Sequence, residues 1–218
     1  GFDALDQWIG HGLRQGELLL LGGAQGVGKT TLCREMVRRF PNLRFSISHT
    51  TRPLRGGDQE GRDYYFVSEE TFQRMIEEGE FWEWATIYGH RYGTSRKKLQ
   101  EMLDQGHDVI LDIDGQGARQ LRTQKIPAVY IFILPPSMEE LRRRLSQRHT
   151  EGPEGLQERL GKALAEMEEA RQYDYFIIND DLEIAQGKLE AILRAEPCRR
   201  ERMISFLDSL LQRGKRRP

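Results

Sequence analysis

Short apolar runs alternate with amphipathic stretches along most of the chain. The runs are typical of buried strands in a parallel sheet and lie at residues 17–22, 44–48, 108–113, 128–134 and 175–179. Helical periodicity between and after them predicts helices at residues 30–40, 95–105, 115–122, 137–148, 156–172, 181–195 and 199–213. This alternation predicts an α/β fold, with a mostly parallel sheet covered by helices on both faces.

The rhythm changes between residues 50 and 93. Residues 49–63 are rich in Gly, Pro and charge, and we expect a long irregular connection there. Short aromatic strands are predicted at residues 64–67 and 81–88, on either side of a helix at 69–78. The whole stretch reads as a small insertion on the core.

Composition narrows the class of protein. The chain has 218 residues, fits one domain, and carries a formal net charge of −1, so it lacks the overall positive field of a nucleic-acid binder. No apolar run reaches the ~18 residues of a membrane span. The start shows no signal-peptide pattern, and the two cysteines are far apart. We therefore expect a cytoplasmic protein with reduced thiols and no membrane or nucleic-acid partner.

A phosphate-binding loop follows the first apolar run. The sequence G-x-x-x-x-G-K-[ST] is matched by Gly23, Ala24, Gln25, Gly26, Val27, Gly28, Lys29 and Thr30. A strand precedes the motif and a helix follows it, as such a loop requires. Backbone N–H groups and Lys29 would bind the phosphates of a nucleoside triphosphate such as ATP, together with Thr31, while the Thr30 hydroxyl would face Mg²⁺.

A second acidic signal supports the metal assignment. The apolar run at 109–111 ends in Asp112, and an acid at such a strand end faces the Mg²⁺ shell in P-loop proteins. The alternative is that Asp112 only caps the next helix. Asp114, two residues later, would lie on the same side if the strand continued.

Arg52 and Arg55 are three residues apart in a Pro/Gly-rich frame. Arginine suits two-pronged phosphate binding, and the phenol of Tyr64 could add a hydrogen bond. Taken singly, each of these residues is better explained as a solvated surface group.

Five stretches together resemble the guanylate kinase family in the family's order, at residues 46–66, 79–85, 89–94, 110–117 and 177–181. The resemblance implies a P-loop NTPase core at residues 17–47, 95–145 and 160–195. It also implies a GMP-binding insertion at 48–94 and a helical lid at 146–159, with a further helix at 199–213. The implied activity is transfer of the ATP γ-phosphate to GMP or dGMP with Mg²⁺, giving ADP and GDP.

The resemblance also implies residue roles. The GMP phosphate would be held by Arg52, Arg55, Tyr64 and Tyr92, and guanine would be recognised by Ser48, Glu83, Thr94 and Asp114. The lid residues Arg148 and Arg159 would join Lys29 and Arg52 in catalysis, and Asn179 would approach the adenine side. Guanine presents adjacent N1–H and N2–H₂ donors, which suit one carboxylate such as Glu83.

Some features depart from the family pattern. Ala24-Gln25 and Thr30 replace the family's usual Pro-Ser and Ser, and the opening to residue 18 resembles RecA-like ATPases. Three alternatives remain open: a non-catalytic binding module, a kinase for another phosphorylated acceptor, and a DNA-stimulated ATPase. The apolar stripe of the helix at 199–213 is expected to pack on the core or on a second subunit of a homo-oligomer.

Overall fold

The computed structural model describes residues 17–147 and 153–215. Its main sheet has five parallel strands in the order β2-β7-β1-β8-β9. These strands are β1 (Leu18–Gly22), β2 (Leu43–Phe45), β7 (Asp108–Asp112), β8 (Val129–Leu134) and β9 (Tyr175–Ile178). The predicted α/β architecture is confirmed.

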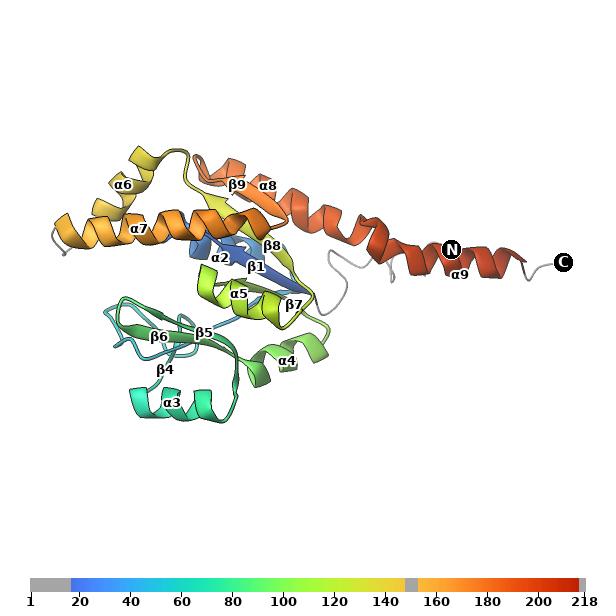
Figure 1. Ribbon diagram of the computed structural model, residues 1–218. Helices are drawn as coiled ribbons and strands as arrows, with labels where there is room; N and C mark the ends of the chain where they lie inside the picture. The colour runs from blue at the N-terminus through green and yellow to red at the C-terminus, as the bar shows by residue number, and fades with distance from the viewer. Residues whose placement is uncertain (1–16, 148–152, 216–218) are drawn as a thin grey trace.

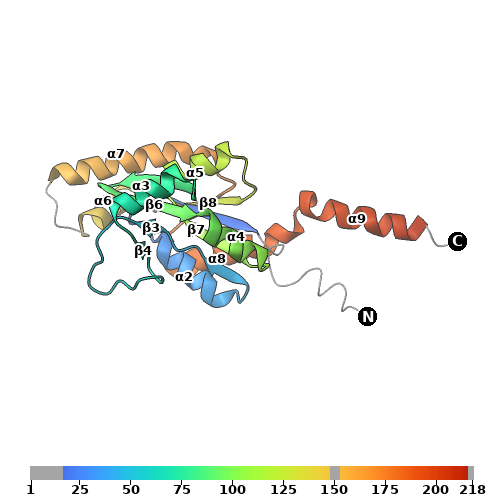
Figure 2. The same ribbon diagram turned by 90° about the horizontal axis from the view of Figure 1, so that it is seen from below.

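Alternate side chains of each strand point to opposite faces of the sheet, and both faces are buried along β1, β7 and β8, whereas Phe176 and Ile178 of the edge strand β9 are exposed. Leu19 and Leu21 pack on one face, and Leu18 and Leu20 on the other. The first face is covered by α2 (Lys29–Arg39), α6 (Met138–Ser146), α7 (Pro153–Glu169) and α8 (Leu182–Ala195). The second face is covered by α4 (Arg96–Asp104) and α5 (Gly115–Thr123). The one-turn helix η1 (Ala170–Gln172), which follows α7 in the sequence, also packs on this face. Figures 1 and 2 show these layers.

Adjacent strands β1 and β7 send their chains to opposite faces of the sheet. The helix after β1 is α2, on the first face, and the helix after β7 is α5, on the second. Leu21 is paired with Asp112, so the two strands end side by side. Ligands of open α/β sheets bind in the crevice at such a switch point.

A smaller sheet lies beside the core and has the order β4-β3-β6-β5. It is built from β3 (His49–Thr50), β4 (Tyr65–Phe66), β5 (Phe81–Ile87) and β6 (His90–Ser95). Helix α3 (Glu69–Glu77) is capped by Ser68 and packs Phe72 and Met75 against Phe81. The insertion therefore has a hydrophobic cluster of its own.

Four local predictions need correction. Strand β3 lies inside the predicted irregular connection, and β6 was not predicted at all. Both depend on pairing with each other and with β4 and β5, which local sequence does not reveal. Strand β2 ends at Phe45 rather than residue 48, and α7 begins at Pro153 rather than residue 156. Arg148 and the RecA-like opening up to residue 16 lie outside the described residues.

The last helix, α9 (Arg200–Lys215), follows the one-turn helix η2 (Glu196–Cys198) and extends away from the core (Figures 1 and 2). Its first turn is held by Arg202, which forms ion pairs with Glu17 and Glu196. Further along, its exposed apolar side chains are Ile204, Leu207, Leu210 and Leu211. The expectation that this stripe packs on the core is wrong beyond the first turn, and packing on a second subunit stays a prediction. Of the helices described, none combines the length and apolarity needed to cross a bilayer.

Candidate active site

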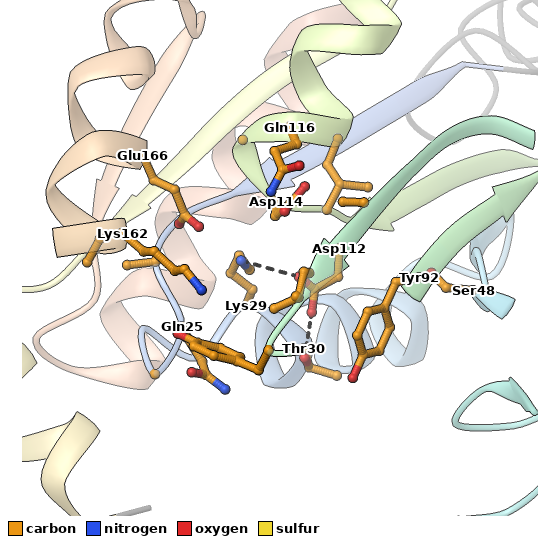
Figure 3. A pocket seen from close by; sticks show the side chains of 18 of the residues that line it. Gln25, Lys29, Thr30, Ser48, Tyr92, Asp112, Asp114, Gln116, Lys162 and Glu166 are labelled. Carbon is orange, nitrogen blue, oxygen red and sulfur yellow. Dashed lines mark hydrogen bonds and ion pairs between the residues drawn. The ribbon is translucent and has the colours of Figure 1, made fainter. Parts of the chain in front are cut away.

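A cavity of about 440 Å³ opens at the carboxyl ends of β1 and β7, between the core and the insertion. Its walls come from the phosphate loop, the end of β7, the strands β5 and β6, and helix α7 (Figure 3). The predicted site residues that line it are Ala24, Gln25, Gly26, Gly28, Lys29, Thr30, Thr31, Ser48, Tyr64, Glu83, Tyr92, Asp112, Asp114 and Arg159. The structure thus brings most predicted residues to one place.

The donor end of the cavity is the phosphate loop. The Lys29 ammonium donates to the carbonyl oxygen of Gly23, and its Nζ lies 3.7 Å from Oδ1 of Asp112. The Thr30 hydroxyl donates to Oδ2 of the same carboxylate over 2.5 Å (Figure 3). Asp112 therefore faces the loop, as the metal assignment requires, and the residue that caps α5 is Asp114.

The pair formed by Thr30 and Asp112 fits Mg²⁺. Both supply hard oxygen ligands, and Mg²⁺ is usually held by one or two protein oxygens together with substrate phosphates and water. In residues 17–147 and 153–215 there is no group of three or more His, Cys, Asp or Glu side chains suited to a metal. A metal that arrives with a nucleotide does not need such a group.

Asn179 lies behind the phosphate loop rather than in the cavity. Its buried side-chain amide donates to the carbonyl oxygen of Val27 over 2.7 Å. Gly28 has a φ of 88°, and a Cβ there would lie 2.7 Å from Nδ2 of Asn179. Glycine is required at this position on both grounds. Asn179 therefore supports the conformation of the loop without lining the cavity.

The acceptor end is organised around Glu83, whose side chain is buried in β5. The Thr94 hydroxyl donates to its Oε1 over 2.5 Å, which explains why Thr94 is adjacent to the cavity without lining it. Burial raises the pKa of Glu83 to about 7, against the opposing effect of the Thr94 hydrogen bond. Asp114, whose own pKa is raised by burial, adds like-charge repulsion.

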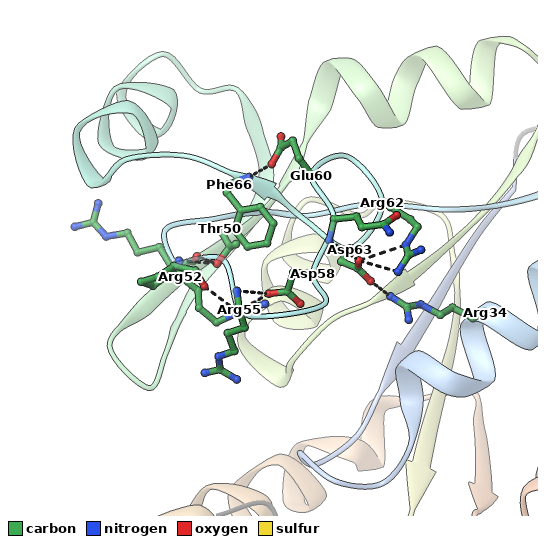
Figure 4. A network of polar contacts seen from close by, with 12 residues as sticks. Arg34, Thr50, Arg52, Arg55, Asp58, Glu60, Arg62, Asp63 and Phe66 are labelled. Atoms are coloured by element: carbon green, nitrogen blue, oxygen red, sulfur yellow. Dashed lines mark hydrogen bonds and ion pairs between the residues drawn. The ribbon is translucent and has the colours of Figure 1, made fainter. Parts of the chain in front are cut away.

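The two predicted phosphate-binding arginines do not line the cavity. Figure 4 shows their contacts with Asp58. Arg52 is buried, and its Nη1 donates to Asp58 over 2.9 Å while its guanidinium lies 5.1 Å from the ring centroid of Tyr64. Arg55 is exposed, and its backbone N–H donates to the same aspartate. Tyr64 and Tyr92 do face the cavity, with ring centroids 5.7 Å apart. The phosphate role of the arginines stays a prediction.

Helix α7 supplies a wall that the sequence reasoning largely missed. Besides Arg159, whose guanidinium lies 5.2 Å from the ring centroid of Tyr88, the helix contributes Lys162 and Glu166. Burial raises the pKa of Glu166 to about 7, and in the described residues its Oε2 has no hydrogen-bond partner. The spacing of 159, 162 and 166 places all three on one helix face, and this signal was available in the sequence.

A second missed pair connects the core to the insertion. Arg34 on α2 forms a short ion pair with Asp63, and both residues line the cavity (Figure 4). The Asp63 carboxylate also accepts from the backbone N–H of Gln59 over 2.9 Å, which lowers its pKa. Helix α2, which begins at the phosphate loop, therefore also contacts the insertion at residues 48–94.

Comparison with known proteins identifies the family. The family model for guanylate kinase matches residues 15–196. The chain belongs to the guanylate kinase family. A guanylate kinase from Geobacter sulfurreducens is 48% identical over 197 residues, which cover 90% of this chain and 97% of that relative. A guanylate kinase from Symbiobacterium thermophilum is 47% identical over 201 residues, covering 92% and 95%.

The fold agrees with this assignment. The crystal structure of guanylate kinase from Anaplasma phagocytophilum superposes with a TM-score of 0.69 at 37% identity, covering 88% of this chain and 92% of that one. The guanylate kinase match stops at residue 196, so it includes both sheets and the cavity but ends before α9.

Proposed function

We propose that this chain transfers the γ-phosphate of ATP to GMP, and also to dGMP, giving ADP and GDP in guanine nucleotide metabolism in the cytoplasm. One observation carries the proposal. A single cavity holds the phosphate loop with Lys29, Thr30 and Asp112 at one end and the buried pair of Glu83 and Thr94 at the other. The family membership supports this arrangement.

At the donor end, the loop amides and Lys29 would bind the ATP phosphates, with Ala24 and Thr31 on the adjoining surface. Thr30 and Asp112 would hold Mg²⁺, which supplies charge neutralisation to the phosphates when bound. Lys29 lies between Gly23 and Asp112, so its ammonium is held in place before any phosphate arrives. Asn179 would act on ATP through the loop that it supports.

At the acceptor end, ionised Glu83 would accept from guanine N1–H and N2–H₂, with Thr94, Ser48 and Asp114 completing recognition. Adenine has an acceptor at N1 and no 2-amino group, so AMP would leave the buried carboxylate unpaired. A site built on such hydrogen bonds can reject the wrong base by about 10⁴-fold.

The remaining groups would bind the acceptor phosphate and complete the site. Tyr64 and Tyr92 lie at the cavity wall, and Arg52 and Arg55 would reach the GMP phosphate once Asp58 releases Arg52. No general base is needed, because the GMP phosphate is itself an anionic nucleophile. Catalysis then depends on alignment and charge neutralisation, to which Arg148 and Arg159 would contribute. Closure of the insertion at 48–94 and the lid at 146–159 would exclude water and limit ATP hydrolysis.

The test is a coupled assay of ADP release with ATP and a panel of acceptors: GMP, dGMP, AMP and UMP. We expect turnover with GMP and dGMP, little with AMP or UMP, and loss of activity when EDTA removes Mg²⁺. Binding of GMP without ADP release would indicate a non-catalytic module. Equal turnover of another phosphorylated acceptor would overturn the guanine assignment.

A further inference from the structure

Strand β5 carries Glu83 and is the edge strand of the small sheet. Its inner edge pairs with β6, where Glu83 is opposite Thr94. Backbone N–H and C=O groups of successive residues point to opposite edges of a strand. Trp82 and Trp84, on either side of Glu83, therefore direct their backbone groups away from β6. An unpaired edge of this kind needs another partner.

Two glutamines supply that partner, Gln120 of the core helix α5 and Gln124, the residue at the C-cap of this helix. The Gln120 amide both accepts from the backbone N–H of Trp84 over 3.2 Å and donates to its carbonyl oxygen over 2.7 Å. Four residues later, Nε2 of Gln124 donates to the carbonyl oxygen of Trp82 over 2.8 Å. A side-chain amide has the same donor and acceptor groups as a peptide, so Gln120 substitutes for a neighbouring strand.

The same helix also touches the Glu83 carboxylate. A Cβ placed on Gly117 would lie 2.3 Å from Oε2 of Glu83, so only glycine allows this approach. Helix α5 begins three residues after Asp112, and its cap is Asp114. The helix that contacts β5 therefore begins beside the cavity, which Asp114 and Gly115 both line.

We propose that Gln120 is a positioning residue for acceptor recognition, because its amide fixes β5 against α5 and so sets the place of the Glu83 carboxylate. The inference rests on the proposed function, in which Glu83 recognises guanine by accepting hydrogen bonds from it. A carboxylate that accepts two adjacent N–H groups must be placed within about 0.5 Å, and side chains that are not themselves held rarely reach this. Gln120 does not line the cavity, so it would act only through Glu83.

The variant Gln120→Met keeps the length of the side chain and removes both hydrogen bonds. We expect the KM and the calorimetric Kd for GMP to rise about tenfold. The KM for ATP and kcat should stay within about twofold of the wild type. The preference for GMP over IMP, which lacks the 2-amino group, should fall, since the carboxylate no longer meets both donors. Gln124→Met, which loses one bond to the strand, should show the same pattern with a smaller change.

Gln100→Met is the matched control. Gln100 lies on the exposed surface of α4, and its amide donates to Asp104 one turn away over 2.8 Å. The Gln100→Met variant should leave kcat, the KM values for ATP and GMP, and the Kd for GMP unchanged. A second variant, Gln120→Glu, keeps the acceptor but offers no donor to the Trp84 carbonyl, so it should also weaken GMP binding and provides the test if Gln120→Met does not fold.

Two results would overturn the inference. One is a GMP affinity within twofold of the wild type in a folded Gln120 variant. The other is an equal rise in the KM of ATP and GMP with a lower melting temperature, which would indicate a general structural role. Failure of the wild-type chain to bind GMP would instead refute the proposed function, so the two failures are distinguishable.

Discussion

The two ends of the cavity are built in different ways. The donor end is one continuous segment, from Gly23 to Thr31, in which backbone geometry creates the binding surface and β7 adds Asp112. The acceptor end is assembled from Glu83 on β5, Thr94 on β6 and Asp114 at the cap of α5, and Glu83 and its strand are held by Thr94 and by Gln120 of a separate helix. A site formed by one continuous segment can be recognised from a short sequence motif, whereas a site formed by residues of several elements depends on the tertiary fold.

The electrostatics of the two ends also differ. At the donor end, the ammonium of Lys29 and the carboxylate of Asp112 lie within 3.7 Å of each other and are partly exposed. At the acceptor end, Glu83 forms no ion pair within residues 17–147 and 153–215, and burial raises its pKa to about 7. We therefore expect changes at the donor end to alter turnover, and changes at the acceptor end to alter GMP recognition and its pH dependence.

The largest effect is expected for Lys29→Met. Removing an ammonium that stabilises charge on the transferred phosphoryl group should lower kcat by about 10³-fold. Calorimetric GMP affinity should stay near the wild type, because Lys29 belongs to the donor end. Lys97→Met on the exposed face of α4 is the control and should be neutral. Turnover near the wild-type rate would remove Lys29 from the catalytic assignment.

Glu83→Gln is expected to have the next largest effect. The amide keeps the size of the carboxylate but offers one oxygen in place of two, so the N1–H and N2–H₂ donors of guanine cannot both be satisfied. The KM for GMP should rise about 10²-fold, while the KM for ATP stays near that of the wild type. Glu77→Gln, on the exposed side of α3, provides the control. If GMP affinity is unchanged, the guanine-reading role is wrong.

The pH profile should distinguish the two ends further. Below a pKa of about 7, Glu83 becomes protonated, loses an acceptor and gains a donor that faces the donors of guanine. The value of kcat/KM for GMP should therefore fall up to about tenfold per pH unit below 7 and level off above it. GMP itself titrates near pH 6, so the comparison with Glu83→Gln isolates the enzyme group. An identical profile in that variant would assign the pH dependence to the substrate.

This difference in construction also explains what the sequence could predict. The strand, loop and helix around Lys29 follow from the local pattern, and the position of Asp112 beside this loop follows from its place at the end of an apolar run. Strand β6 and the contacts of Gln120 could not be predicted, because they depend on which segments meet in space. Arg52 was identified by residue type, but its pairing with Asp58 follows from the turn that brings the two together.

Arg34→Ala should have the smallest effect, and it tests whether the two ends are coupled directly. The Arg34 side chain is 47% exposed, and exposed ion pairs contribute only about 0–1 kcal/mol to stability. Its partner Asp63 keeps the hydrogen bond from the backbone N–H of Gln59, so the loop that contains these two residues should retain its conformation. We expect the KM for GMP to change by less than about threefold, with kcat and the KM for ATP unchanged. The control variant Arg38→Ala, one turn away on α2, should leave kcat and both KM values unchanged. A change of tenfold or more in both KM values would show that α2 links the two ends, and the separation of donor and acceptor functions would then be incorrect.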